Sequence, residues 1–166
     1  TLSSPVLNSS NEVAFMATLS GNGVTATNAA GIWSADSSGS IQQIARAGAA
    51  VPGIPGAIFS AFSQLAYPDE AGVVFVATMA TGSGGITTAN NVGLWAAEAP
   101  GDTPELIIRK GDSFTVGAAP KTVSDFQIFN PPSITAGSAC HMNALGDLIF
   151  KISFTDGTSG LFCFLR

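Results

Sequence analysis

The residues best suited to chemistry in this sequence are one histidine and two cysteines. His141 directly follows Cys140, and the second cysteine is Cys163. Structural zinc sites use four Cys or His ligands in closely spaced pairs, so these three residues do not complete such a site. We therefore expect no metal and no cofactor. The cysteines leave three alternatives open, which are a disulfide between Cys140 and Cys163, two free thiols, or a bond between chains.

Other catalytic arrangements are missing as well. A Ser–His–Asp device could use only His141, and no G-x-S-x-G motif is present to place a nucleophile. The eleven Asp and Glu residues are spread through segments that read as turns, without a calcium-loop pattern or a facing pair for hydrolysis. The glycine-rich stretch "GNGVTA" lacks the third glycine and the helix of a phosphate-binding loop. We therefore expect a protein that is not an enzyme.

The composition limits the class of protein and its partners. Only 10% of the residues are charged, against roughly 25% in an average soluble domain, and 46% are apolar, which excludes a disordered chain. The net charge is −5 and the six basic residues are scattered, so we expect no nucleic-acid partner. No apolar run reaches the ~18 residues of a membrane span. So weakly charged a chain fits either association with copies of itself or a small secreted domain.

The elements are predicted from a pattern that occurs three times. Phe15, Phe75 and Phe150 each lie in a segment rich in β-branched and aromatic residues, and they are 60 and 75 residues apart. Each segment is followed by glycine, an aliphatic residue and an aromatic residue, as in "GIW", "GLW" and "GLF". The first two copies continue to "IQQIARAG" and "ELIIRKG", which we expect to be strands. With an insertion between Asn130 and Met142 set aside, the period is about 60 residues.

This pattern predicts an all-β domain over residues 1–166, built from tandem repeats at approximately 1–56, 57–120 and 121–166. Each repeat would hold four short antiparallel strands, as a β-propeller blade does, with the repeated aromatic residues packed between sheets. The chain ends four residues after Phe162, so we expect the third repeat to lack its last strand. A closed pseudo-threefold trefoil or prism is the alternative fold.

The last predicted strand would be an apolar sheet edge. Exposed apolar edges invite a strand from another chain. Head-to-tail addition of this kind gives fibres, or rings where the rotation allows closure. The residues expected at this assembly edge are Leu161, Phe162, Cys163, Phe164 and Leu165.

The turn before each Phe-containing strand resembles a motif of a known family. Residues 143–150 (NALGDLIF) and 8–15 (NSSNEVAF) are similar to N-x-x-G-x-x-A-F, the motif of bacterial tandem-repeat surface proteins with varied C-terminal anchors. Ile149 replaces the alanine in one copy and Asn11 the glycine in the other, and we expect Asn11 and its counterpart Gly146 to adopt a left-handed backbone. The resemblance implies export and cell-surface residence, with no catalytic residues. Because family members carry an anchor, we expect this chain to be an excised portion or to assemble without one.

Two functions are compatible with these observations. The first is a non-enzymatic, extracellular structural protein, a subunit of a fibre or cell-surface assembly that is completed by strand exchange between copies. The alternative is an adhesion module that binds carbohydrate or protein through the loops "TATNAAG" and "TTANNVG".

Overall fold

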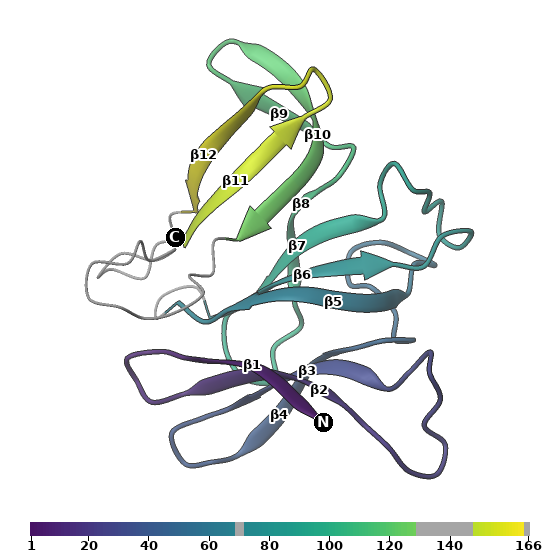
Figure 1. The fold of residues 1–166 in the computed structure, drawn as a ribbon, viewed down its shortest axis with the longest axis vertical. Coiled ribbons are helices and arrows are strands. Elements are labelled where there is room, and N and C mark those ends of the chain that lie inside the picture. Colours follow the sequence, from purple (N-terminus) through teal and green to yellow (C-terminus); the bar gives the residue numbers. More distant parts are fainter. Residues whose placement is uncertain (69–71, 129–147, 165–166) are drawn as a thin grey trace.

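The computed structural model describes residues 1–68, 72–128 and 148–164 of the 166-residue chain. Every element of regular secondary structure assigned in that part is a β-strand (Figure 1), which confirms the predicted all-β class. The strands form three antiparallel sheets of four strands each. Within the described residues, no helix is long and apolar enough to cross a membrane.

The three sheets follow one another along the chain. The first has the spatial order β1-β2-β3-β4 and the second the order β5-β6-β7-β8, whereas the third has the order β12-β11-β10-β9. The strands of the first sheet are β1 (Leu2–Leu7), β2 (Val13–Thr18), β3 (Ala30–Ala35) and β4 (Ile41–Arg46). Those of the second are β5 (Phe59–Ala66), β6 (Val73–Met79), β7 (Val92–Ala97) and β8 (Glu105–Arg109). Those of the third are β9 (Ser113–Val116), β10 (Ala119–Ile128), β11 (Leu148–Phe154) and β12 (Ser159–Phe164).

The third sheet does not have the three strands that the sequence predicted. Its fourth strand, β9, precedes the others in the chain and pairs with the first half of β10, from Ala119↔Val116 to Thr122↔Ser113. The turn between them contains Gly117, whose φ of 63° suits glycine. The predicted strand number is therefore wrong. Among the described strands β12 pairs with β11 alone, and the assembly edge itself stays a prediction.

The turn between β1 and β2 shows how local sequence fixes the chain. The side-chain oxygen of Asn8 accepts hydrogen bonds from the backbone N–H groups of Ser10 (3.1 Å) and Glu12 (2.9 Å). The side-chain amide of Asn8 also donates to the Glu12 carboxylate at 2.8 Å. Asn11 has a φ of 59°, which confirms its predicted left-handed conformation. Gly146 lies outside the described residues.

The three sheets place matching residues opposite one another. The repeated phenylalanines lie on β2, β6 and β11, and each pairs with an aromatic residue on the neighbouring strand. The pairs are Phe15↔Trp33, Phe75↔Trp95 and Phe150↔Phe162. The second ring of each pair lies over a glycine two residues earlier in its own strand. A Cβ atom on that glycine, which is Gly31, Gly93 or Gly160, would come within 3.0 Å of the ring. This close approach explains the glycine in "GIW", "GLW" and "GLF".

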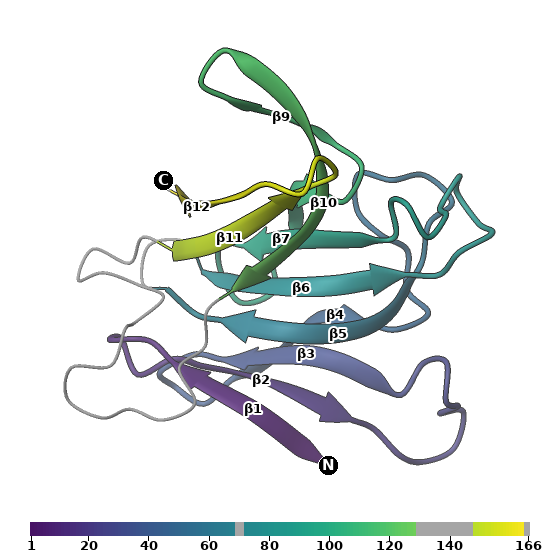
Figure 2. The same cartoon turned by 45° about the horizontal axis from the view of Figure 1, so that its top comes forward.

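The second sheet lies between the other two, as Figures 1 and 2 show, with the first sheet in purple and blue and the third in green and yellow. One hydrophobic core joins the first sheet to the second, and another joins the second sheet to the third. Successive side chains of β6 enter different cores, with Phe75 and Ala77 in the first and Val74 and Val76 in the second. The second sheet is therefore buried on both faces. The near-continuous apolar sequence of β6, which lacks alternating polar residues, predicts this burial.

Two polar contacts tie the layers together. The hydroxyl group of Tyr67 donates a hydrogen bond of 3.0 Å to the carboxylate of Glu12 in the first sheet's turn. Burial, together with this hydrogen bond and the charge of Glu12, raises the pKa of Tyr67 above its usual value. The side-chain oxygen of Gln64 accepts a hydrogen bond of 2.6 Å from the backbone N–H of Ile128 in the third sheet.

Candidate functional site

The predicted assembly edge lies on β12 (Ser159–Phe164), except for Leu165, which is outside the described residues. Near the start of this hairpin, the N–H of Phe154 donates to the carbonyl of Thr158 at 2.9 Å. Hydrogen-bonded and non-hydrogen-bonded pairs alternate along antiparallel strands. The N–H and C=O groups of Leu161 and Cys163 therefore point away from β11, towards an edge on which no described strand pairs.

Corresponding positions in the other sheets show what this edge lacks. Ile32 of β3 and Leu94 of β7 each precede the aromatic residue of the strand, as Leu161 does in β12. Ile32 pairs with Ala45 and Leu94 pairs with Ile108, both on a fourth strand. Ile32 is 0% exposed and Leu94 1%, whereas Leu161 is 67% exposed. Among the described residues, Leu161 therefore has neither the neighbouring strand nor the covering layer that its counterparts have.

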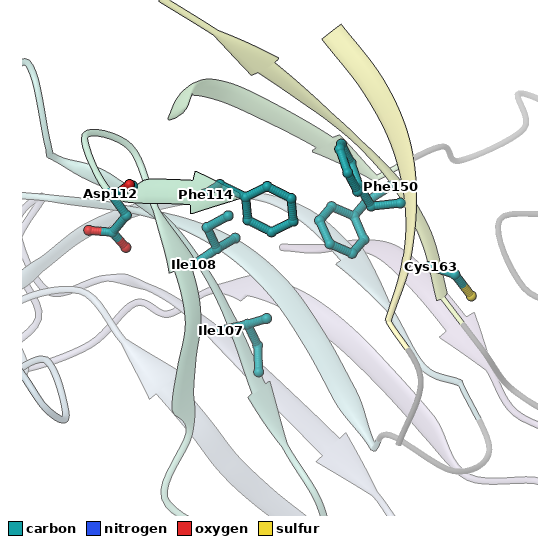
Figure 3. A pocket seen from close by; sticks show the side chains of 8 residues that line it. Ile107, Ile108, Asp112, Phe114, Phe150 and Cys163 are labelled. Atoms are coloured by element: carbon teal, nitrogen blue, oxygen red, sulfur yellow. The ribbon is translucent and has the colours of Figure 1, made fainter. Parts of the chain in front are cut away.

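A cleft of about 280 Å³ opens beside this edge, between the second and third sheets (Figure 3). Among the described residues that line it, Asp112 is the only charged one. Its carboxylate accepts a hydrogen bond of 2.8 Å from the N–H of Arg109 and forms an ion pair with the guanidinium at 3.5 Å. Because that carboxylate already has partners, the rest of the cleft offers mainly an apolar surface. The lining residues are Ile107, Ile108, Asp112, Ser113, Phe114, Phe150, Phe162 and Cys163.

The second sheet shows which group would fill such a cleft. There, Leu106 of β8 stands opposite Trp95 and packs against the first core. Residues directly opposite each other on neighbouring strands project from the same face of a sheet. A strand added beside β12 would therefore place the residue opposite Phe162 on the cleft side, where it faces Ile107 and Ile108.

The described residues contain no group of three or more His, Cys, Asp or Glu side chains that could hold a metal ion. Cys163 is exposed on β12. Cys140 and His141 lie outside the described residues, so the Cys140–Cys163 disulfide stays a prediction. What β12 and its cleft can do is pair a backbone and receive an apolar side chain, which is how an extended strand is recognised at a sheet edge.

Hydrogen bonds within each loop stabilise the two loops that were considered for adhesion. In the β2–β3 loop the side-chain oxygen of Asn28 accepts a hydrogen bond from the N–H of Thr25, and in the β6–β7 loop Asn90 accepts one from Thr87, both at 2.7 Å. Their side-chain amides donate to carbonyl groups within the same loops, at 3.2 and 3.3 Å. The asparagines therefore act as turn-stabilising residues, and no exposed aromatic residue lies in either loop to stack on a sugar.

Sequence reasoning missed several residues of the cleft. Ile107, Ile108 and Phe114 were not singled out, although Phe114 forms an edge-to-face contact with Phe162 at a centroid distance of 4.8 Å. The alternating pattern of "SFTV" before Gly117 is the signal that could have revealed the β9 hairpin and its inward phenylalanine.

Comparison with known proteins identifies a family but no individual relative. No curated protein and no solved structure matches the chain. One family model, described as a family of unknown function (DUF7453), matches residues 1–164. Because the match spans almost the whole sequence, the chain belongs to the DUF7453 family.

Proposed function

We propose that this protein is a non-enzymatic structural module that assembles outside the cell, with β12 of one copy accepting a strand from another copy. In this proposal the three sheets derive from one repeated unit and are stacked as propeller blades are, and the third sheet carries β9 on its far edge but has no described counterpart of β4 and β8 beside β12. The matching Phe–aromatic pairs and the glycines beneath the second rings support this view.

The observation that carries the proposal is the position of Leu161. Its backbone polar groups point towards an edge that is open within residues 148–164, and its side chain is 67% exposed where Ile32 and Leu94 are covered. An open edge with apolar side chains is a site of strand addition unless something covers it. The cleft beside it would take a side chain of the added strand, which makes the addition selective for an apolar residue at one position.

The second sheet suggests the character of the added strand. In β8, Leu106 and Ile108 stand opposite Trp95 and Leu94. We therefore expect a strand with an aliphatic residue opposite Phe162 and another opposite Leu161, one for each face of the sheet. A segment resembling β8 of a second copy meets this description, whereas one resembling β4 does not, because β4 places Gln43 opposite Trp33.

The composition supports assembly, and the motif resemblance supports export. A chain with 10% charged residues has little charge repulsion to keep copies apart, which favours a protein that works as an assembly. The likeness of the β1–β2 turn to the surface-protein motif agrees with an extracellular location. Adhesion through the loops stays the alternative, and binding on a glycan array would favour it.

The test is a measurement of molecular mass as a function of concentration for three versions of the chain. The native sequence should associate as concentration rises. Leu161→Pro removes an outward N–H, and proline is tolerated on an edge strand, so this variant should fold but associate at least tenfold more weakly. Leu161→Val keeps the N–H and is the matched control, which should associate like the native chain.

Two results would refute strand addition. One is a native chain that remains a monomer at every concentration tested. The other is a Leu161→Pro variant that keeps its native circular dichroism spectrum and associates as strongly as the Leu161→Val control.

A further inference from the structure

The opposite end of the molecule carries an aromatic pair that repeats the geometry of a buried one. Phe15 and Trp33 are stacked at a centroid distance of 6.3 Å and an interplanar angle of 17°. Phe75 and Trp95 are stacked at 6.1 Å and 15°. The second pair is 0% exposed beneath the first sheet, whereas Phe15 and Trp33 are only partly buried and belong to neither core.

Three exposed aliphatic residues lie on the same face as this pair. The strand register places Leu2 opposite Ala17, Leu7 opposite Val13 and Ile41 opposite Ala35. Those partner positions are two residues from Phe15 or Trp33 in their strands and therefore lie on the same face as the pair. Their exposed fractions are 72%, 63% and 62%, and they are three of the five large apolar residues that the described part exposes. We call this surface the Trp33 face, and it consists of Leu2, Leu7, Phe15, Trp33 and Ile41.

The contact between the first two sheets shows what such a face receives. The Phe75–Trp95 face of the second sheet is covered by the other side of the first sheet, through Ala14, Met16 and Ile32. Phe62, which stands opposite Ala77 as Leu2 stands opposite Ala17, packs against the same core. The covering surface is thus aliphatic and comes from strands two and three of a neighbouring sheet.

The third sheet offers a surface of this kind on the side that faces away from the second sheet. Phe150, Ile152 and Phe162 point towards the second core, so the residues that alternate with them point outward. We call the outward surface the Leu161 face, and it consists of Ile149, Lys151, Leu161 and Cys163. These residues occupy the places that Ala14, Met16, Ile32 and Ser34 hold in the first sheet, by their spacing from Phe150 and Phe162.

We propose that the Trp33 face of one copy docks against the Leu161 face of a second copy, so that the molecule continues outside itself the sheet-on-sheet packing that it contains. Each side of the new contact matches one side of an existing contact in strand position, and most of its residues are apolar. Lys151 fits this arrangement because its aliphatic stem can lie where Met16 lies, while its ammonium group reaches the aromatic rings. A contact between two different faces repeats from copy to copy, and it closes only if the rotation permits.

This docking does not depend on strand addition, because it uses outward side chains of the first and third sheets and no backbone edge. The test is sedimentation equilibrium of two variants and a control. Ile41→Lys places a charge on the Trp33 face, and Leu161→Lys places one on the Leu161 face. Gln42→Lys adds the same charge to the next residue of β4, whose side chain points to the other side of the sheet, and it is the matched control.

We expect the native chain and Gln42→Lys to form oligomers whose mass grows with concentration, and each of the two face variants alone to associate at least tenfold more weakly. An equimolar mixture of the face variants should form dimers that grow no further, because Ile41→Lys keeps an intact Leu161 face and Leu161→Lys an intact Trp33 face.

Three results would overturn the docking. Unchanged association of Ile41→Lys would show that the Trp33 face is not used, whatever the outcome of Leu161→Pro. If Leu161→Lys forms dimers by itself, and the equimolar mixture with Ile41→Lys contains no more dimer than Leu161→Lys alone accounts for, two Trp33 faces pair with each other. A native chain that stays monomeric would refute docking between copies altogether.

Discussion

The comparison of Phe75 and Phe15 makes the sharpest test of the layered arrangement. Both residues occupy the same place in the sequence pattern, and each pairs across its sheet with a tryptophan. Phe75 is 0% exposed and has ring contacts with Phe59, Phe62 and Trp95 at centroid distances of 6.0 to 6.3 Å. Phe15 is partly exposed, and among the described residues its one ring contact is with Trp33.

The magnitudes follow from these surroundings. Replacing a buried phenylalanine by alanine removes the burial free energy and leaves a cavity, which costs about 3–5 kcal/mol, and we expect Phe75→Ala to fall in that range. For Phe15→Ala we expect about 1–2 kcal/mol, from one aromatic contact of about 0.5–1.5 kcal/mol and the burial of part of a ring. The two variants should therefore differ by about 2–3 kcal/mol in the free energy of unfolding.

Urea titration at low protein concentration measures this difference, with the fluorescence of Trp33 and Trp95 as the signal. For a slope near 2 kcal/mol per molar urea, the two midpoints should lie about 1–1.5 M apart. Equal midpoints would refute the arrangement, because they would mean that Phe15 is covered as fully as Phe75. At high concentration the cost of Phe15→Ala should rise if the Trp33 face docks on another copy.

Three further predictions concern single contacts. Gly93→Ala should lower the melting temperature by several degrees, because its Cβ would overlap the buried Trp95 ring at a cost of about 1–3 kcal/mol, whereas Gly160→Ala, beside a ring on the edge strand, should lower it less. Asn8→Ala should cost about 1–3 kcal/mol in urea titration, because two backbone N–H groups lose their acceptor. The native chain should lose stability above pH 10, and Tyr67→Phe should remove that loss. The raised pKa of Tyr67 keeps its phenol neutral in the folded state. The contribution of Tyr67 to the free energy of unfolding is therefore fully present below the pKa of the unfolded chain, and it falls as the phenol of the unfolded chain ionises. Urea midpoints at pH 8 and pH 11 measure that loss, and an equal fall in the variant would contradict it.

Much of the secondary structure could be predicted from the sequence because strand signals are local. The segments around Phe15, Phe75 and Phe150 are rich in β-branched and aromatic residues, and all three are strands. The segment "IQQIARAG", which has some helical propensity, is also a strand over Ile41–Arg46, as its likeness to "ELIIRKG" indicated. The left-handed Asn11 followed from the tolerance of asparagine for that conformation.

The remainder depends on contacts between segments that are distant in the sequence. The hairpin of β9 and β10 was missed because β9 is only four residues long. Its Phe114 is recognised as a core residue only through its ring contacts with Phe154 and Phe162, which are distant in the sequence. The cleft could not be foreseen for the same reason, since its lining comes from β8, β9, β11 and β12. The expectation that the repeated aromatic residues are core residues is confirmed for Phe75 and Trp95, whereas their counterparts on an end sheet are only partly buried.

The burial of β6 on both faces affects how the chain opens and closes. Separation of the first sheet would bare the aromatic side of the second sheet, and separation of the third sheet would bare the aliphatic side that carries Val74, Val76 and Leu94. Neither outer sheet can separate without exposing a large apolar surface to water, so partial opening has a high free-energy cost. The amide protons of β6 should consequently be among the slowest in the molecule to exchange with solvent, with protection that fades towards β1 and β12.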